Sequence, residues 1–302
     1  MTQFWEETGT ALSKRLFASG GAGLVFWTWA VAMWAIHQGG WRYVQDTVRA
    51  LTSDTGLATL LATSIIAIIV LSASSLVVER LTLPVLRLLE GYWPRLVNRL
   101  WTKRIARWHR KVQELQTLPP APEATTDAIA AASAALRRFP PDDQLMPTRI
   151  GNIIRAGERR PATWYGLDAV IVWPQLWLVL PEQPRSDLTT ARTQLNNAVT
   201  AWTWAVLSCV LGFLWLPALG VGLVVAFAIW RWWVPAAADT YATLVSAVFD
   251  THRFALYDAL HYPRPTTSAD EPRLGRALTH SLWDDPSQAP TTYAAPPAAH
   301  QP

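Results

Sequence analysis

The segment from Thr55 to Lys111 constrains the fold of this chain more than any other feature. Residues 55–78 (TGLATLLATSIIAIIVLSASSLVV) carry no charge. About 20 apolar residues in a helix that rises about 1.5 Å per residue cross a hydrocarbon core of about 30 Å, so this segment predicts a membrane span. Basic residues follow it closely, and such a cluster marks the cytoplasmic side of a membrane.

A basic amphipathic helix is predicted within PRLVNRLWTKRIARWHRKVQEL. Its apolar residues recur on one stripe at helical spacing and basic residues cover the rest, as in helices that lie in a membrane interface. Residues 80–111 hold nine basic residues and one acidic residue, so they account for the positive formal net charge of the chain, which is +4. Because this excess lies beside a span, we expect anionic phospholipid as a partner and no nucleic acid. The basic residues of this helix are Arg95, Arg99, Lys103, Arg104, Arg107, Arg110 and Lys111.

The composition also favours a membrane protein. Hydrophobic residues make up 51% of the 302 residues and charged residues only 16%. Many of the 18 tryptophans fall in or at the ends of apolar runs, where indole rings favour the level of the lipid headgroups. The single cysteine, Cys209, has no partner for an intramolecular disulfide. No cleavable signal peptide is evident at the amino terminus.

Three further spans are expected. An uncharged run begins after Arg15, and a second one of 38 residues lies between Arg192 and Arg231. The second run would measure about 57 Å as one helix, which is too long for one crossing, and Pro217 stands near its middle. We therefore divide it into a tight hairpin in which Arg231 snorkels or pairs. The four predicted spans are about 16–38, 56–78, 197–216 and 218–237.

Between the two hairpins the sequence predicts a mainly helical cytoplasmic insert, in which Pro84 and Pro94 break the chain into short pieces. Pro147 starts a helix that places Arg149, Asn152 and Arg155 close together. Two arginines and an asparagine can bind a phosphate or a lipid headgroup, whereas the plainer alternative is that they bridge to a neighbouring element. Arg149, Asn152, Arg155 and Arg253 are the candidate headgroup or anion ligands.

Two other segments of the second half leave alternatives open. Residues 168–181 are almost wholly apolar but too short for a comfortable span, so they form a buried strand or helix, an interfacial helix or a re-entrant segment. In the helix after the fourth span, an ion pair between Asp250 and Arg253 is expected. His252 and His261 lack the spacing of a helical metal pair, so no metal or other cofactor is expected.

Three strings resemble a family of bacterial integral membrane proteins without an assigned activity. They are PTRIGNIIRAGE, YGLDAVIVWPQLWLVLP and FDTHRFALYDALHYPRP, at residues 147–158, 165–181 and 249–265. The resemblance covers roughly the second half of the chain. It implies a bacterial multispanning protein and supplies no catalytic residue, ligand or partner.

These patterns predict an all-α integral membrane protein of the bacterial cytoplasmic membrane, with four transmembrane helices in two hairpins and both termini cytoplasmic. Because no catalytic motif is present, we expect a non-enzymatic scaffold or a subunit of an oligomer, which could line a pore. The alternative is a membrane-interface enzyme that acts on a lipid or lipid-linked substrate. The predicted regions are an N-terminal hairpin (1–83), the insert (84–185), a second hairpin with a helical extension (186–262) and a tail (263–302) that is disordered after 284.

Overall fold

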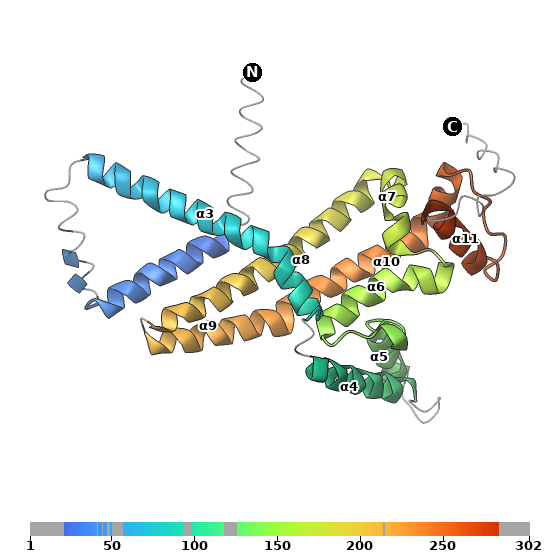
Figure 1. The fold of residues 1–302 in the computed structure, drawn as a ribbon, viewed down its shortest axis with the longest axis horizontal. Helices are drawn as coiled ribbons and strands as arrows, with labels where there is room; N and C mark the ends of the chain where they lie inside the picture. The colour runs from blue at the N-terminus through green and yellow to red at the C-terminus, as the bar shows by residue number, and fades with distance from the viewer. Residues whose placement is uncertain are drawn as a thin grey trace, which may run out of the picture. The chain divides into compact units, whose positions relative to one another are not determined.

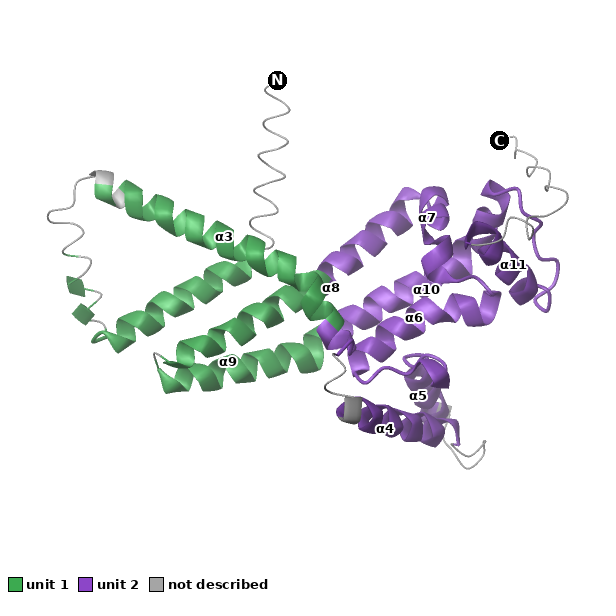
Figure 2. Cartoon of the chain, viewed as in Figure 1, with its two compact units in different colours: residues 1–87, 196–234 green, residues 88–195, 235–302 purple. Residues whose placement is uncertain are grey.

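The computed structural model describes residues 21–40, 57–93, 98–117, 126–213 and 215–283, with isolated positions between 42 and 49. These residues form helices joined by turns and short connections, and they include no strand (Figure 1). The predicted all-α class is therefore confirmed. The chain divides into two compact units, unit 1 (residues 1–87 and 196–234) and unit 2 (residues 88–195 and 235–302) (Figure 2). The predicted C-terminal tail after 284 lies outside the described residues.

Unit 1 contains most of the long apolar helix α3. Helix α3 runs from Leu57 to Glu90 and passes through Pro84, so the break that we predicted at this proline is wrong. Proline removes its own N–H bond and crowds the carbonyl group four residues earlier, but helices in membrane proteins tolerate it where neighbouring groups satisfy the freed carbonyl. The helix ends one residue before Gly91, whose positive φ of 105° suits glycine at a helix terminus. The other helices with residues in unit 1 are Gly21–His37, α8 (Glu182–Ser208), η3 (Cys209–Phe213), α9 (Leu216–Ala228) and η4 (Ile229–Trp233).

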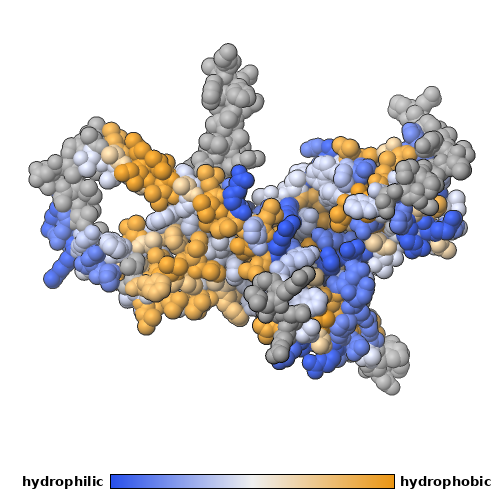
Figure 3. Space-filling view, in the orientation of Figure 1, coloured by the Kyte–Doolittle hydropathy of each residue, from blue (hydrophilic) through white to orange (hydrophobic). Residues whose placement is uncertain are grey.

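Among the residues that the structure describes, two helices are long and apolar enough to cross a membrane, namely Leu61–Glu90 and the continuous helix Leu216–Ala259. Every side chain of α3 from Leu61 to Val70 is exposed, with Ile66, Ile68 and Ile69 between 59% and 63% exposed. The space-filling view shows the corresponding apolar surface over α3 and α9 (Figure 3). A helix from the core of a soluble protein would be buried instead, so this exposure favours a membrane setting.

The uncharged run between Arg192 and Arg231 breaks near Pro217, as the sequence predicts. Helix α8 passes into the 3-10 turn η3, and α9 begins with Pro217 in its first turn, where the missing N–H costs nothing. Gly222 lets α9 approach the end of α8, because a Cβ there would lie 2.9 Å from Ser208 Oγ and 3.0 Å from Cys209 Sγ. This close approach of small residues is typical of helix contacts in lipid.

Unit 2 is built around a core of side chains from α7, α8, α10 and α11 with their connections. Val172 and Leu176 of α7, Phe249 and Leu256 of α10, and Leu278 of α11 are at most 1% exposed. The apolar segment 168–181 is therefore a helix with one buried side. The helices with residues in unit 2, besides α8 and the end of α3, are α4 (Asn98–Gln116), α5 (Thr126–Leu136), η2 (Asp142–Gln144), α6 (Arg149–Tyr165), α7 (Ala169–Val179), α10 (Val234–Ala259) and α11 (Glu271–Trp283).

Candidate functional site

The start of α6 is a tightly packed helix cap. Thr148 Oγ1 accepts a hydrogen bond from the backbone N of Gly151 (3.0 Å) and donates one to the carbonyl oxygen of Glu90 (2.7 Å). Gly151 is needed for this approach, because a Cβ there would lie 2.0 Å from the same carbonyl oxygen. The PTRIGN sequence thus has a clear structural role, in which its threonine and glycine join the beginning of α6 to the end of α3.

The three candidate anion ligands at the start of α6 do not form one open cradle. Asn152 is 1% exposed, and its Oδ1 accepts a hydrogen bond from the backbone N of Met146 (2.7 Å). Arg149 is exposed on the first turn. Arg155 donates to the Tyr92 hydroxyl at 3.4 Å. The cavity beside Arg155 measures about 30 Å³, which is far below the volume of small-molecule sites, about 300–1,000 Å³.

Glu158 also lines this small cavity. Burial raises the pKa of its carboxyl group, and the positive charges of Arg155, Arg159 and Arg192 only partly oppose that effect. A neutral carboxylic acid is therefore favoured at this position relative to an exposed glutamate.

The fourth candidate, Arg253, lies in a clamp between α10 and α11. Its Nε donates to Glu271 Oε1 at 2.6 Å, and the two side chains are only 17% and 9% exposed. The guanidinium group also stacks 4.4 Å from the ring centroids of both Tyr165 and Phe254. Arg253 is therefore committed to a buried ion pair and to two aromatic faces.

The predicted ion pair between Asp250 and Arg253 is wrong, because Arg253 pairs with Glu271 and contacts only the backbone oxygen of Asp250. The Asp250 carboxylate instead accepts hydrogen bonds from the Tyr165 hydroxyl (2.6 Å) and from Arg160 (3.2 Å). Burial, together with the hydrogen bond to Asp250, raises the pKa of Tyr165 to about 12. The tyrosine is therefore a neutral hydrogen-bond donor here.

The YGLD sequence forms the elbow between α6 and α7, against α11. Asp168 caps α7 by accepting from the backbone N of Val170 (2.9 Å), and it pairs with Arg159 at 3.3 Å. Gly166 has a φ of 72° and ends α6. A Cβ on Gly275 of α11 would lie 1.9 Å from the carbonyl oxygen of Tyr165, so only glycine allows this contact.

The predicted basic helix corresponds to α4, which packs beside α5 (Figure 1). Arg104 lies 5.4 Å from the ring centroid of Trp93, and Lys111 lies 5.8 Å from that of Trp108. Arg95 lies outside the described residues, and for Arg99 only its place in the helix is described. The exposed basic side chains of α4 are Lys103, Arg107, Arg110 and Lys111.

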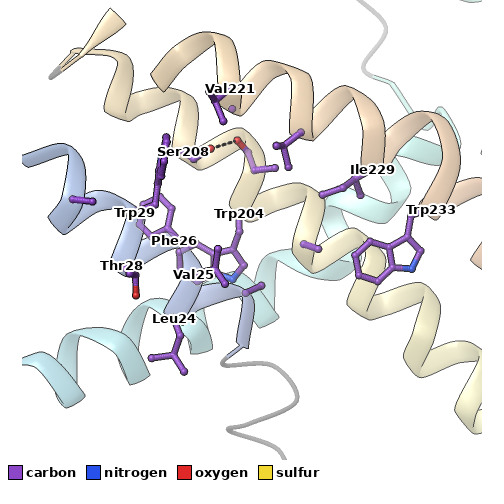
Figure 4. Close-up of a pocket in the computed structure, with 16 residues that line it drawn as sticks. Leu24, Val25, Phe26, Thr28, Trp29, Trp204, Ser208, Val221, Ile229 and Trp233 are labelled. Atoms are coloured by element: carbon purple, nitrogen blue, oxygen red, sulfur yellow. Dashed lines mark hydrogen bonds between the residues drawn. The ribbon is translucent and has the colours of Figure 1, made fainter. Parts of the chain in front are cut away.

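An apolar cavity of about 720 Å³ lies within unit 1, between the helix Gly21–His37, α8, α9 and η4 (Figure 4). Phe26 and Trp204 form part of its wall, with ring centroids 4.8 Å apart. The Ser208 hydroxyl in the wall donates to the carbonyl oxygen of Ala205 at 2.6 Å, so this polar group is satisfied within its helix. We did not predict this cavity from the sequence, because its walls come from segments almost 200 residues apart.

The chain was compared with models of protein families, with curated proteins and with solved structures, and none of them matches. The site is therefore interpreted from its own chemistry.

The structure places the polar residues from which an interfacial active site could be built in different structural contacts. Asn152 and Arg155 lie at the start of α6, Asp168 caps α7, and Asp250 and Arg253 contact each other and Tyr165. In the part of the chain that the structure describes, no group of three or more histidine, cysteine, aspartate or glutamate side chains could hold a metal ion. The residues concerned are Arg149, Asn152, Arg155, Asp168, Asp250, His252 and Arg253.

Proposed function

We propose that this protein is a non-enzymatic integral membrane protein that serves as a scaffold or as a subunit of a homo-oligomer. The observation that carries the membrane part of this proposal is the exposed apolar surface of α3. Eight large aliphatic side chains between Leu61 and Val77 are 39–63% exposed. Full burial of such a side chain contributes about 1.5–3 kcal/mol of hydrophobic stabilisation. Because these eight side chains are about half exposed, the protein in water would lack roughly 8 kcal/mol of that stabilisation. That is comparable with the whole stability of a domain, about 5–15 kcal/mol.

Contacts within unit 1 support a membrane unit of four spans. Trp27 Nε1 donates to Ser74 Oγ at 3.0 Å, and the hydroxyl groups of Thr82 and Thr200 are hydrogen bonded at 3.0 Å. Such interhelical bonds between small polar side chains are a usual means of helix association in lipid. The helix Gly21–His37 has 17 residues, which is at the short end of the range for a span, about 17–25. We therefore propose that this helix and the end of α8 accompany α3 and α9 across the membrane.

The exposed cations of α4 support a cytoplasmic position for unit 2. Each basic residue near an anionic leaflet contributes about 1 kcal/mol of attraction, so the four exposed ones together contribute about 4 kcal/mol. We propose that anionic phospholipid is the partner of this helix, and that both termini are cytoplasmic. The resemblance to a bacterial membrane protein family supports the bacterial cytoplasmic membrane as the location.

The polar contacts of unit 2 favour a structural role over catalysis. Asp168, Asp250 and Arg253 each take part in a cap or an ion pair that joins two helices. The alternative, a membrane-interface enzyme, requires polar groups that converge on a substrate-sized space. The cavity beside Arg155 is much smaller than that, and a larger one of about 490 Å³ beside Arg160 is lined by none of the seven candidate residues.

Native mass spectrometry of the protein released from lipid nanodiscs tests the proposed assembly. The expected result is a homo-oligomer of the 33.6 kDa chain, and a closed ring of four or more chains would support a pore. The face of α3 that carries Thr59, Thr63 and Ala67 is exposed and its side chains are small, so a helix of a second copy can approach it closely. A monomer under all lipid conditions would contradict the oligomer, and replacement of Ala67 by Trp should weaken an oligomer that uses this face.

A further inference from the structure

The apolar cavity of unit 1 opens at the surface of the protein, because several residues of its wall are exposed. An apolar occupant would cover this concave face. At about 720 Å³ this cavity falls in the range of small-molecule sites, about 300–1,000 Å³. An unfilled space of that size would deprive its walls of their packing contacts.

Water is a poor occupant because the walls offer it few partners. A buried water needs about two to four polar partners. Most of the wall is aliphatic or aromatic, and one of its hydroxyl groups, that of Ser208, already donates within its own helix. Apolar cavities of this kind stay dry or take apolar guests.

A helix from a second copy is too thick for the space. A helix with its side chains is about 10–12 Å across and rises about 5.4 Å per turn, so one turn fills on the order of 500 Å³. The cavity holds less than two turns. A narrow flexible hydrocarbon chain fits better, because the cavity has room for roughly two dozen groups of about 30 Å³, the size of a water molecule or a methylene group.

The mouth of the cavity is continuous with the exposed apolar surface of unit 1. Val25 is 71% exposed, Val221 46% and Val225 43%, and all three line the cavity. If unit 1 lies in a bilayer, this mouth faces acyl chains, which are the abundant hydrocarbon there. The π-turn η4 contributes Ile229 and Trp233 to the wall, and π-turns within α-helices are frequent at functional sites.

We propose that this cavity binds one acyl chain of a membrane phospholipid as an integral part of the folded protein. The inference rests on the proposed membrane setting of unit 1. It assigns the aromatic residues Phe26, Trp204 and Trp233 to the wall of a lipid site, in addition to any role in anchoring helices at the headgroup level.

The test uses the full chain in nanodiscs of phosphatidylethanolamine and phosphatidylglycerol that contain a phospholipid with a photoreactive diazirine in its acyl chain. After irradiation, mass spectrometry locates the labelled residues. The matched variants are Val221→Trp, at the mouth, and Val224→Trp, on the same helix and 68% exposed but outside the cavity wall. Ala201→Phe fills the cavity from α8 as a second blocking variant.

The expected result is label concentrated on residues 22–32 and 201–233, lost in the Val221 and Ala201 variants and retained in the Val224 variant. Native mass spectra should show one retained mass that equals a phospholipid. Label spread evenly over every exposed apolar helix, or equal label in all three variants, would overturn the proposal. A retained isoprenoid mass would overturn the assignment to a phospholipid.

Alkaline carbonate extraction of the membranes separates this inference from the function on which it rests. Release of the protein would overturn both. Retention of the protein without cavity labelling would overturn the acyl-chain site alone. Each blocking variant is compared with the wild-type protein in thermal unfolding, so that loss of label in a folded variant reports on the cavity.

Discussion

Loss of one charge from the buried pair between Arg253 and Glu271 should destabilise the protein strongly. The two side chains are 17% and 9% exposed, and the Nε to Oε1 distance is 2.6 Å. Removal of one partner from a buried pair costs about 3–5 kcal/mol, because the other charge stays buried without compensation. Melting temperatures of domains of about 150–250 residues fall by about 2–4 °C per kcal/mol, so Glu271→Gln should lower the midpoint by roughly 6–20 °C.

The assay is thermal unfolding of the full chain in detergent micelles, followed by near-ultraviolet circular dichroism. Arg253→Met and the double variant Arg253→Met/Glu271→Gln complete a double-mutant cycle, in which the double variant should cost less than the sum of the single ones. Arg253→Lys keeps the charge but loses stacking on two rings, so it should restore only part of the stability. Strict additivity of the two single changes would refute a buried pair.

A matched control shows whether burial decides the effect. Arg138 and Asp239 form a bidentate ion pair with N to O distances of 2.9 and 2.7 Å, but their side chains are 47% and 33% exposed. Exposed pairs contribute about 0.2–1 kcal/mol, so Arg138→Gln should shift the midpoint by at most a few degrees. An effect as large as that of Glu271→Gln would contradict the argument from burial.

Three further predictions concern the start of α6 and its surroundings. Burial raises the pKa of Glu158, so the ionised carboxylate lowers the stability of the folded protein at high pH. This loss of stability disappears as the pH falls and the carboxyl group is protonated. Glu158→Gln should therefore raise the melting midpoint at about pH 8 but hardly at about pH 4. Gly151→Ala should lower the stability by about 1–3 kcal/mol in thermal unfolding, because its Cβ would lie 2.0 Å from the carbonyl oxygen of Glu90. The control is Gly220→Ala, whose Cβ would have no atom within 4 Å and which should be neutral or stabilising in the same assay. Thr148→Val removes the cap and should cost about 1 kcal/mol in urea unfolding; an unchanged midpoint would exclude the capping role.

Helix content and the broad division of the chain follow from local sequence patterns. The uncharged run before Arg231 and the position of Pro217 are enough to predict where α8 gives way to α9. Periodicity also locates the basic helix α4. These features depend on charge, on apolar spacing and on proline, all of which can be read within one segment.

The partners of the polar residues could not be predicted because they come from distant parts of the chain. Tyr165 donates a hydrogen bond to Asp250, which is 85 residues away in the sequence. Arg253 pairs with Glu271 and not with the carboxylate of Asp250, which is nearer in the sequence. Gly151 and Gly275 have no conformational signature of their own, since their role is to admit a backbone carbonyl from another helix. The sequence shows only that polar groups are present, and tertiary packing decides which of them meet.

Topology labelling in spheroplasts tests the proposed membrane protein most directly. The chain has a single cysteine, so Cys209→Ser provides a background into which one new cysteine is placed at a time. The suitable positions are Gln38, after the first helix, and Ser133 on α5, both of which are exposed. A membrane-impermeant maleimide should label the cysteine at position 38 from outside, and the cysteine at position 133 only after lysis. Labelling of both positions from outside, or of neither before lysis, would contradict the proposed four-span arrangement.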